Sequence, residues 1–384
     1  MQQSLNRMVK SIEISGIRKF FNLVANETDI VSLTIGQPDF HTPEHIKNAA
    51  SHALMQNKTT YTHNAGIIEL RKAISEYNEA NYSICYNPEN EIIVTTGASQ
   101  ALDITFRTIL NPNDEVILPG PIYPGYEPLI TLAGAKAIHA DTTKDNFKLT
   151  KEALANHITD KTKCVVLPYP SNPTGASFTK EELCDLVSVL KNKDIFILAD
   201  EIYSELVYDH KHVSIASFPE VRDKTIVVNG LSKSHAMTGF RIGYLLAPAW
   251  LSSHMLKVHQ YNVSCASSIS QYAALEALTA GQADPALMCE SYKKRRDYVY
   301  ERLVRMGLDV NIPEGAFYFF PKFPIHNMTS FELGLELARK GKVALVPGES
   351  FSNLGKGYMR LSYAYDFNTL EKGLDRLEDF LQVQ

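Results

Sequence analysis

The stretch KTIVVNGLSKSHAMTGFRIGY (residues 224–244) opens with a run of β-branched residues that ends at Asn-Gly. Similar runs recur along the chain between segments of helical pattern. They are EIIVTTG (91–97), DEVILPG (114–120), KCVVLPY (163–169), DIFILAD (194–200) and KTIVVNG (224–230). Apolar strands that alternate with helices are typical of a parallel sheet covered by helices on both faces. The sequence therefore predicts an α/β fold, with its ligand site at the carboxyl ends of these strands.

The pattern changes near residue 285. YKKRRDYVYERLVRMG (292–307) predicts a long charged helix, and TLEKGLDRLEDFL (369–381) predicts a final helix after short strand-like segments. These features indicate a second, smaller α+β domain. The first forty or so residues contain no run for a sheet core and can pack on that domain. We therefore predict a large domain over 45–284 and a small domain made of 1–44 and 285–384.

Composition and charge exclude several classes of protein. A formal net charge of -5 offers no basic surface for nucleic acid or for an anionic membrane. No run of about eighteen apolar residues and no signal-peptide core is present, so we expect a cytoplasmic protein that acts on small molecules. The five cysteines form no CxxC pair, which argues against a disulfide framework or a metal site. We expect them to be reduced and mostly in the core.

Lys233 is the first candidate for chemistry. It lies between two serines after a predicted buried strand, and Arg241 follows eight residues later. A lysine amine forms an imine with an aldehyde only when it is deprotonated, which requires a partly desolvated pocket near other positive charge. Ser232 and Arg241 can hold a phosphate dianion. Taken alone, the motif also fits a surface lysine after a turn.

Further candidates follow the other predicted strands. Asp200 and Tyr203 lie in DEIYSEL (200–206), and Asn172 lies in SNPTG (171–175). In TTGASQAL (95–102), Gly97 permits a tight turn, and the amides of Ala98 and Ser99 at a helix start suit an anion. Each motif also has a structural interpretation, since an aspartate can cap a helix and Asn-Pro forms plain turns.

Three more motifs contain aromatic, arginine or glycine candidates. Tyr123 and Tyr126 lie in PGPIYPGYEP (119–128), where plain packing is an alternative. Arg360 in GYMRLSYA (357–364) can hold a carboxylate through two parallel hydrogen bonds, although a lone arginine on a strand is usually solvated. Gly36 lies in TIGQPDF (34–40), and Tyr61 lies in TTYTHNAGI (59–67).

Taken in order, these motifs resemble those of the class I and II (fold type I) pyridoxal-phosphate-dependent aminotransferases over essentially the whole chain. The resemblance implies a mostly parallel seven-stranded sheet in the large domain, a smaller α+β domain and a homodimer. It implies that Lys233 holds pyridoxal 5'-phosphate as an internal Schiff base and moves the substrate's α-proton. A protonated ring nitrogen, favoured by a nearby carboxylate, makes the cofactor a better electron sink.

The resemblance also assigns the other roles, with no metal ion. Asp200 pairs with the ring nitrogen, Asn172 and Tyr203 bond the ring oxygen, and Tyr123 stacks on the ring. The phosphate contacts are Ala98, Ser99, Ser232 and Arg241, with Tyr61 reaching the cofactor phosphate of the other subunit. The substrate carboxylate contacts are Arg360, Asn172 and the backbone of Gly36, and Tyr126 supports Asp200 from behind.

The stretches IEISGIRKF, LTIGQPDF, GPIYPGYEP, NGLSKSHAMTG and KVHQYNVSCASSISQ most resemble N-acetyl-L,L-diaminopimelate aminotransferases. This implies amino transfer between N-acetyl-L,L-2,6-diaminopimelate and 2-oxoglutarate, giving glutamate, in lysine biosynthesis. A neighbouring aspartate-specific subgroup places an arginine ahead of a segment like QYNVSCASS (260–268). This chain has Lys257 and His259 there and no arginine, so strict aspartate specificity is not expected. Lys257, His259 or tyrosine residues can contact a substrate tail, and the sequence does not choose among them.

Several alternatives stay open at this point. A broad aromatic or aspartate aminotransferase and a carbon-sulfur β-lyase keep the same cofactor residues and differ in substrate handling. A transcription regulator with an aminotransferase-like domain needs an appended DNA-binding domain, and the motifs begin too near residue 1 to leave room for one. A nicotinamide dehydrogenase needs a G-x-G-x-x-G turn that the first strand lacks. The segment SGIRKF (15–20) is a candidate lid over the site.

Overall fold

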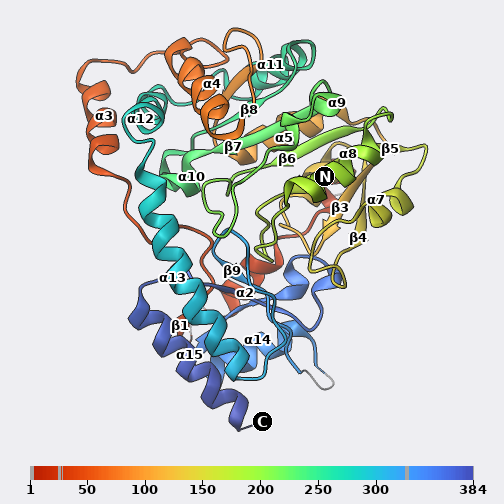
Figure 1. Ribbon diagram of the computed structural model, residues 1–384, viewed down its shortest axis with the longest axis vertical. Helices are drawn as coiled ribbons and strands as arrows, with labels where there is room; N and C mark the ends of the chain where they lie inside the picture. The colour runs from red at the N-terminus through yellow and green to blue at the C-terminus, as the bar shows by residue number, and fades with distance from the viewer. Residues whose placement is uncertain (1–3, 25–26, 28, 325–327, 384) are drawn as a thin grey trace.

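A seven-stranded sheet forms the centre of the larger lobe in the computed structural model, which describes residues 4–24, 27, 29–324 and 328–383 (Figure 1). Its strands, in the order β2-β8-β7-β6-β5-β3-β4, are β2 (Ile92–Thr95), β3 (Glu115–Gly120), β4 (Lys136–Asp141), β5 (Thr162–Pro168), β6 (Phe196–Asp200), β7 (Thr225–Gly230) and β8 (Gly243–Leu246). Only β8 pairs antiparallel to its neighbours. The predicted α/β class with a mostly parallel seven-stranded sheet is confirmed.

All five apolar runs form strands. Two further strands, β4 and β8, were not predicted from the sequence. β4 lies at the edge of the sheet, where only one of its six residues is fully buried, so it lacks a continuous apolar run. β8 has four residues and begins with a glycine. Short strands of this kind give little periodic signal.

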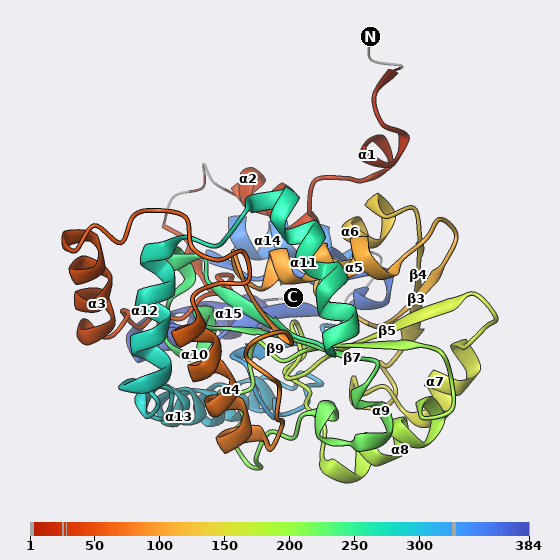
Figure 2. The same cartoon turned by 90° about the horizontal axis from the view of Figure 1, so that it is seen from above.

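Helices cover both faces of the sheet (Figure 2). They are α3 (Glu44–Met55), α4 (Ile68–Tyr82), α5 (Ala98–Ile109), α6 (Tyr126–Leu132), α7 (Lys151–His157), α8 (Lys180–Leu190), α9 (Pro219–Arg222), α10 (Leu231–Ser234), α11 (Ala249–Val263) and α12 (Ser268–Thr279). Side chains along each strand alternate between two buried clusters: Ile197 and Ala199 of β6 belong to one, and Leu198 to the other. Burial on both faces explains why these strands are apolar throughout.

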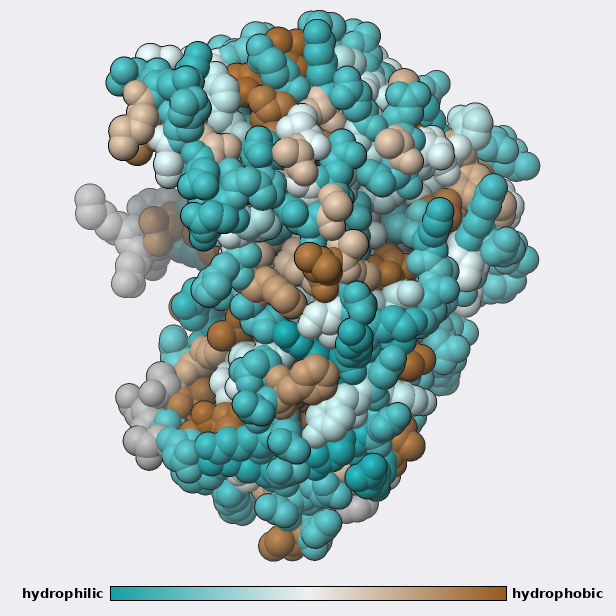
Figure 3. All heavy atoms as spheres, turned by 60° about the vertical axis from the view of Figure 1, so that its left-hand side comes forward, coloured by the Kyte–Doolittle hydropathy of each residue, from teal (hydrophilic) through white to brown (hydrophobic). Residues whose placement is uncertain are grey.

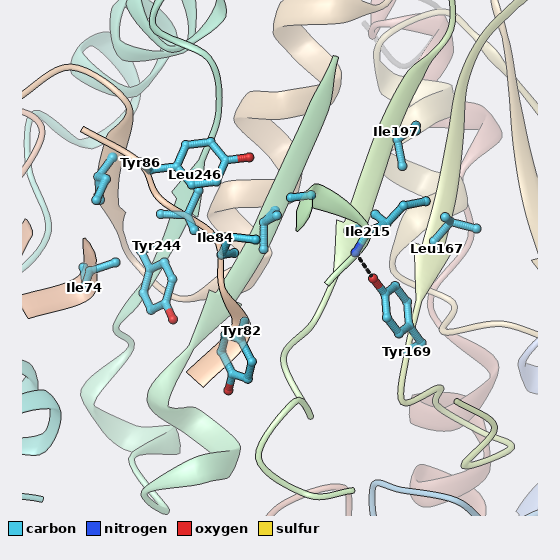
Figure 4. Packing of buried hydrophobic residues seen from close by; sticks show 14 of the residues in the cluster. Ile74, Tyr82, Ile84, Tyr86, Leu167, Tyr169, Ile197, Ile215, Tyr244 and Leu246 are labelled. Atoms are coloured by element: carbon cyan, nitrogen blue, oxygen red, sulfur yellow. Dashed lines mark hydrogen bonds between the residues drawn. The ribbon is translucent and has the colours of Figure 1, made fainter. Parts of the chain in front are cut away.

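Figure 4 shows part of the first of these clusters, in which Tyr169 forms two hydrogen bonds. The hydroxyl of Tyr169 accepts a hydrogen bond from the backbone N–H of Ile215 at 2.8 Å and donates to Glu201 at 3.0 Å. Tyr169 thereby fixes the chain just beyond β5 against the segment after β6. Both of these strand ends lead into candidate site residues.

The smaller lobe contains two short sheets. In one, β1 (Val31–Ser32) pairs in parallel with β10 (Val343–Ala344). In the other, β12 (Met359–Ser362) pairs antiparallel with β11 (Val346–Pro347) and β9 (Tyr318–Phe319). The helices of this lobe are α2 (Gly16–Val24), α13 (Asp284–Arg305), α14 (Ser330–Arg339) and α15 (Phe367–Gln382). The two long helices expected near residues 292–307 and 369–381 are α13 and α15, so both are confirmed.

Before α2, the described chain contains the short helix α1 (Arg7–Ser11), which lies near α6 and has no buried residue (Figure 2). The face in Figure 3 is mostly hydrophilic, with hydrophobic residues gathered near its middle. None of the described helices is long and apolar enough to cross a membrane. Across the described residues, no group of three or more His, Cys, Asp or Glu side chains could hold a metal ion.

The expectation that the cysteines lie mostly in the core is wrong. Cys164 is buried on β5, whereas Cys85 and Cys184 are exposed and the other two, Cys265 and Cys289, are half-buried. None of the five is disulfide-bonded. A scattered cysteine carries no periodic signal of its own, so its burial depends on which face its helix or loop turns to solvent.

Two glycines allow α5 and β8 to approach each other closely. A Cβ atom on Gly243 would lie 2.7 Å from the backbone nitrogen of Ala98 and 2.8 Å from the carbonyl carbon of Gly97. These are backbone atoms and cannot move away like the end of a side chain. The start of α5 is therefore held against the start of β8, which brings their loops into one site.

We predict that Gly243→Ala destabilises the protein by about 1–3 kcal/mol, because overpacking forces the backbone apart. Gly239→Ala is the matched control, since nothing lies within 4 Å of its added Cβ. Urea unfolding of both variants measures the difference. Equal free energies of unfolding for Gly243→Ala and Gly239→Ala would contradict the close approach.

Candidate active site

A cavity of about 430 Å³ lies at the carboxyl ends of the central strands. It is lined by eleven of the twelve residues predicted for the site: Gly36, Ala98, Ser99, Tyr123, Asn172, Asp200, Tyr203, Ser232, Lys233, Arg241 and Arg360. Asp200 ends β6, and Lys233 lies in α10 directly after β7. Parallel strands end at the same edge of a sheet, so residues far apart in sequence meet there. Arg360 comes from β12 of the smaller lobe.

Lys233 has an amine suited to nucleophilic attack. Its Nζ donates to the carbonyl of Gly36 at 2.5 Å and lies 5.7 Å from the ring centres of both Tyr203 and Phe317. Burial, with the positive charges of Arg360 and Arg241 acting in the same direction and Asp200 opposing them, lowers the pKa of Lys233 to about 8. A substantial fraction of the amine is therefore neutral near pH 8.

Asp200 is a buried carboxylate that faces the pocket. Burial raises its pKa to about 6, although it accepts hydrogen bonds from the Tyr126 hydroxyl at 2.6 Å and the Ile202 N–H at 3.3 Å. The hydroxyl of Tyr126 thus supports Asp200, as the sequence indicated. A cationic N–H in the pocket would restore the charged form of this carboxylate.

An anion site surrounds the first turn of α5. Gly97, with a φ of 76°, precedes Ala98 and caps the helix without a side-chain hydrogen bond. The Arg241 guanidinium lies so close that a Cβ on Gly97 would be 2.8 Å from Nη2. Ser232 also lines the pocket. Free helix N–H groups, a guanidinium and a hydroxyl together suit a phosphate dianion.

Arg360 is almost fully buried and has donor capacity left over. Its Nη1 donates to Asn172 Oδ1 at 2.9 Å, and its Nη2 donates to the Thr34 carbonyl at 2.7 Å. Among the described residues, its buried Nε has no hydrogen-bond partner. A buried charged donor without a partner is costly, so this arrangement points to a ligand acceptor such as a carboxylate.

Tyr123 lines the pocket beside Tyr126, with the two rings edge to face at 5.5 Å between centres. Its side chain is 36% exposed, which leaves a ring face available for stacking on a ligand. The side chains of Ile17 and Phe21 on α2 also line the cavity. The segment that the sequence marked as a candidate lid therefore contributes a wall of the pocket.

Three predicted contacts are not brought to the pocket of this chain. Tyr61 does not line it and is 87% exposed. His259 is fully buried in α11, so the expectation that it contacts a substrate tail is wrong. Lys257, two residues earlier in α11, lies beside His254 and does not line the cavity.

The sequence missed Thr34 and Tyr318. Thr34 acts through its backbone carbonyl, which no residue type reveals. Tyr318 lies in the aromatic run GAFYFF (315–320), where a pocket residue is indistinguishable from core residues before the strand pairing is known.

The chain is similar to known aminotransferases in sequence and in structure. A family model described as aminotransferase class I and II matches residues 28–377. A probable N-acetyl-LL-diaminopimelate aminotransferase of Bacillus subtilis is 59% identical, covering 99% of this chain and 96% of that protein. The aromatic-amino-acid aminotransferase 2 of Thermococcus litoralis is 39% identical, covering 99% and 98%. The structure of an aspartate aminotransferase from Rhizobium meliloti matches with a TM-score of 0.94 at 35% identity, covering 99% of each chain.

We predict that Asp200 makes the stability of the ligand-free protein depend on pH. Its folded pKa of about 6 lies above the ordinary value of about 3.9, so the folded state binds more protons between these values. The free energy of unfolding therefore falls by about 3 kcal/mol as the pH rises through this range. Asp200→Asn removes this dependence. Urea unfolding at several pH values measures it, and a constant difference between variant and wild type would refute the burial argument.

Proposed function

This chain belongs to the class I and II aminotransferases, and on that premise we propose that its pocket binds pyridoxal 5'-phosphate for transfer of an amino group between an amino acid and a 2-oxo acid. The observation that carries the proposal is the amine of Lys233, with a pKa lowered to about 8. The amine shares one cavity with a buried carboxylate, an anion site and an incompletely paired arginine. Each of these groups suits a different part of the cofactor or of an amino acid.

The residues present fit the cofactor group by group. The first turn of α5 with Ser232 and Arg241 takes the phosphate, and Asp200 takes the ring nitrogen. Because Asn172 Oδ1 already accepts from Arg360, the amide NH₂ of Asn172 is left to donate to the ring oxygen together with the Tyr203 hydroxyl. Tyr123 covers a ring face. When bound, the cofactor withdraws electrons from the substrate's α-carbon and so weakens its C–H bond.

The chain's own residues position the substrate and move its proton. Arg360 and the backbone of Gly36 hold the α-carboxylate, which fixes the rotation of the amino acid. The Nζ of Lys233, once free, would take the substrate's α-proton as a general base. The depressed pKa of Lys233 suits this role, because the amine must be neutral to accept a proton.

We predict that the rate of cofactor attachment rises about tenfold per pH unit below pH 8 and levels off above it, since only neutral Nζ reacts. Stopped-flow absorbance after mixing the cofactor-free protein with pyridoxal 5'-phosphate measures this rate. Lys233→Ala abolishes both attachment and transamination. Lys163→Ala, whose side chain lies over Phe196 away from the pocket, is the control. Near wild-type turnover by Lys233→Ala would disprove the proposal.

The proposal includes a homodimer in which Tyr61 reaches the partner's cofactor phosphate. Tyr61 is 87% exposed on its own subunit, and Met55 and Tyr261 are exposed to 80% and 89%. Large apolar side chains that face solvent in this way are suited to burial against another chain. The Tyr61 hydroxyl would add one hydrogen bond to a charged group.

Tyr61→Phe should weaken cofactor binding by about 1.5–3 kcal/mol without unfolding the protein. Mixed dimers of Tyr61→Phe and Lys233→Ala chains test whether Tyr61 crosses the interface. If it does, the subunit that retains Lys233 receives an intact Tyr61 from its partner and binds cofactor as the wild type does. Cofactor affinity equal to that of the Tyr61→Phe homodimer would show that Tyr61 acts within its own subunit.

For the substrate we favour N-acetyl-L,L-2,6-diaminopimelate with 2-oxoglutarate, in lysine biosynthesis. The support is the 59% identity to the Bacillus subtilis protein described above. The pocket is consistent with it: among its described lining residues the only arginines are Arg241 and Arg360, which serve the phosphate and the α-carboxylate. No further guanidinium is left in this chain's pocket to select aspartate through its distal carboxylate.

We predict at least about tenfold higher kcat/KM for the acetylated substrate than for phenylalanine, aspartate or unacetylated diaminopimelate, each with 2-oxoglutarate. One methylene changes discrimination by only about 1–3 kcal/mol, so the comparison must include all four. Glutamate release in a coupled assay gives the rates. If phenylalanine or aspartate is preferred tenfold, the lysine-pathway substrate is wrong and a broad aminotransferase is correct.

A further inference from the structure

Tyr318 enters the pocket from the sheet of the smaller lobe. It is the first residue of β9 and lies opposite Ser362 of β12. Arg360 lies two residues before Ser362, so it occupies the same face of the sheet and is a diagonal neighbour of Tyr318. The Arg360 guanidinium carbon accordingly lies 4.5 Å from the centre of the Tyr318 ring. Strand register therefore places an aromatic face against the arginine proposed to hold the substrate.

The hydroxyl of Tyr318 lies beside residues that are proposed to contact the cofactor. It lies 2.9 Å from the hydroxyl of Tyr203, and both side chains are buried. A Cβ on Gly36 would lie 2.7 Å from the same oxygen. The carbonyl of Gly36 accepts from Lys233. One phenol oxygen thus contacts both the tyrosine and the backbone segment beside the reactive amine.

The direction of the Tyr203–Tyr318 hydrogen bond follows from proton counting. Each hydroxyl has a single proton to donate and can also accept. In the proposed function, Tyr203 donates its proton to the ring oxygen of the cofactor. The Tyr203 oxygen is then left to accept, and Tyr318 is the donor. Two consecutive O–H groups polarise each other, which strengthens the bond at the end of the chain.

The segment before Tyr318 is tied to the larger lobe. The backbone N–H of Ala316 donates to the Leu206 carbonyl at 2.8 Å, and the N–H of Gly315 donates to the Gly175 carbonyl at 3.0 Å. Gly175 belongs to the loop that contains Asn172, and Leu206 follows Tyr203 closely in sequence. Tyr318 is therefore held at the point where the sheet of the smaller lobe meets two site loops of the larger lobe.

We infer that Tyr318 is a positioning residue for both halves of the reaction site: its hydroxyl directs the proton of Tyr203 to the cofactor's ring oxygen, and its ring orients Arg360 for the substrate carboxylate. This inference rests on the proposed function, because it requires pyridoxal 5'-phosphate in the pocket. The two roles can be separated by substitution, since phenylalanine keeps the ring and loses only the hydroxyl.

The first test is the pH titration of the bound cofactor's visible absorption. A donor to the ring oxygen competes for the negative charge that holds a proton on the cofactor-linked Nζ of Lys233. Tyr318→Phe weakens that donor, so the proton is held more tightly and the midpoint moves to higher pH by about 0.4 to 1 unit. Tyr203→Phe shifts the midpoint further in the same direction. An unchanged midpoint in Tyr318→Phe overturns the hydroxyl role.

A double variant tests whether the hydroxyl acts through Tyr203. In the Tyr203→Phe background, Tyr318→Phe should produce no further shift, because the relay has already been cut. A full additional shift would show that Tyr318 acts independently and would overturn the inference. Tyr363→Phe is the matched control: its hydroxyl also pairs with a buried tyrosine, Tyr208, at 3.1 Å, yet it does not line the pocket. It should leave the midpoint unchanged.

Tyr318→Leu tests the role of the ring. It also lacks the hydroxyl and must shift the midpoint as Tyr318→Phe does. In addition it removes the ring from Arg360, so KM for the amino donor should rise by about two- to thirtyfold, whereas Tyr318→Phe should leave KM within about twofold. Equal KM values for the two variants overturn the ring role.

Failure of this inference is distinguishable from failure of the proposed function. Wild-type protein that neither develops a visible band with pyridoxal 5'-phosphate nor transaminates would overturn both. Wild-type protein that does both, with Tyr318→Phe titrating at the wild-type midpoint, would overturn only the role of Tyr318. A shifted midpoint in Tyr318→Phe, absent from the Tyr203→Phe background and from Tyr363→Phe, is the result we expect.

Discussion

The burial of the Lys233 amine among charged groups is the constraint on which the rest of the site depends. A lysine at its ordinary pKa is almost fully protonated near neutrality and cannot attack an aldehyde. Desolvation together with the positive charges of Arg360 and Arg241 lowers its pKa to about 8. The same two arginines supply the positive charge that anionic ligands need. In the ligand-free protein the two arginines therefore both attract anions and help to keep the amine neutral.

Burial shifts the pKa of Asp200 in the opposite direction to that of Lys233 and raises it to about 6. The carboxylate that follows it in sequence, Glu201, turns into a polar cluster and away from the cavity. Tyr169 and Ser214 donate to Glu201 at 3.0 and 2.7 Å, and His212 lies 3.1 Å from its other oxygen. The two hydrogen bonds to Glu201 restrain this buried carboxylate. This restraint fixes the end of β6 and so aims Asp200 at the pocket.

The two lobes contribute different kinds of group to the cavity. The parallel strands of the larger lobe end in the lysine, the aspartate and the anion site, all of which suit a cofactor. The smaller lobe adds Arg360, which suits the substrate, and Tyr318, which contacts both sides. Backbone hydrogen bonds from residues 314–316 to Gly175 and Leu206 join the lobes beside the cavity. Small changes in how the lobes meet would therefore move the proposed substrate contact, Arg360, relative to the proposed cofactor contacts.

The sequence by itself determined the fold class and most of the site. Five β-branched runs correctly predicted strands, and short motifs at the strand ends contained Asn172, Asp200 and Lys233. These residues meet because parallel strands end at one edge of the sheet. The sequence did not reveal β4 or β8, which are too exposed or too short for a periodic signal. Only the tertiary structure decided that Tyr318 belongs to the site and that His259 is buried in the core. Those facts depend on cross-strand register and on the burial of a helix face, which arise from contacts between distant segments and leave no mark in local sequence.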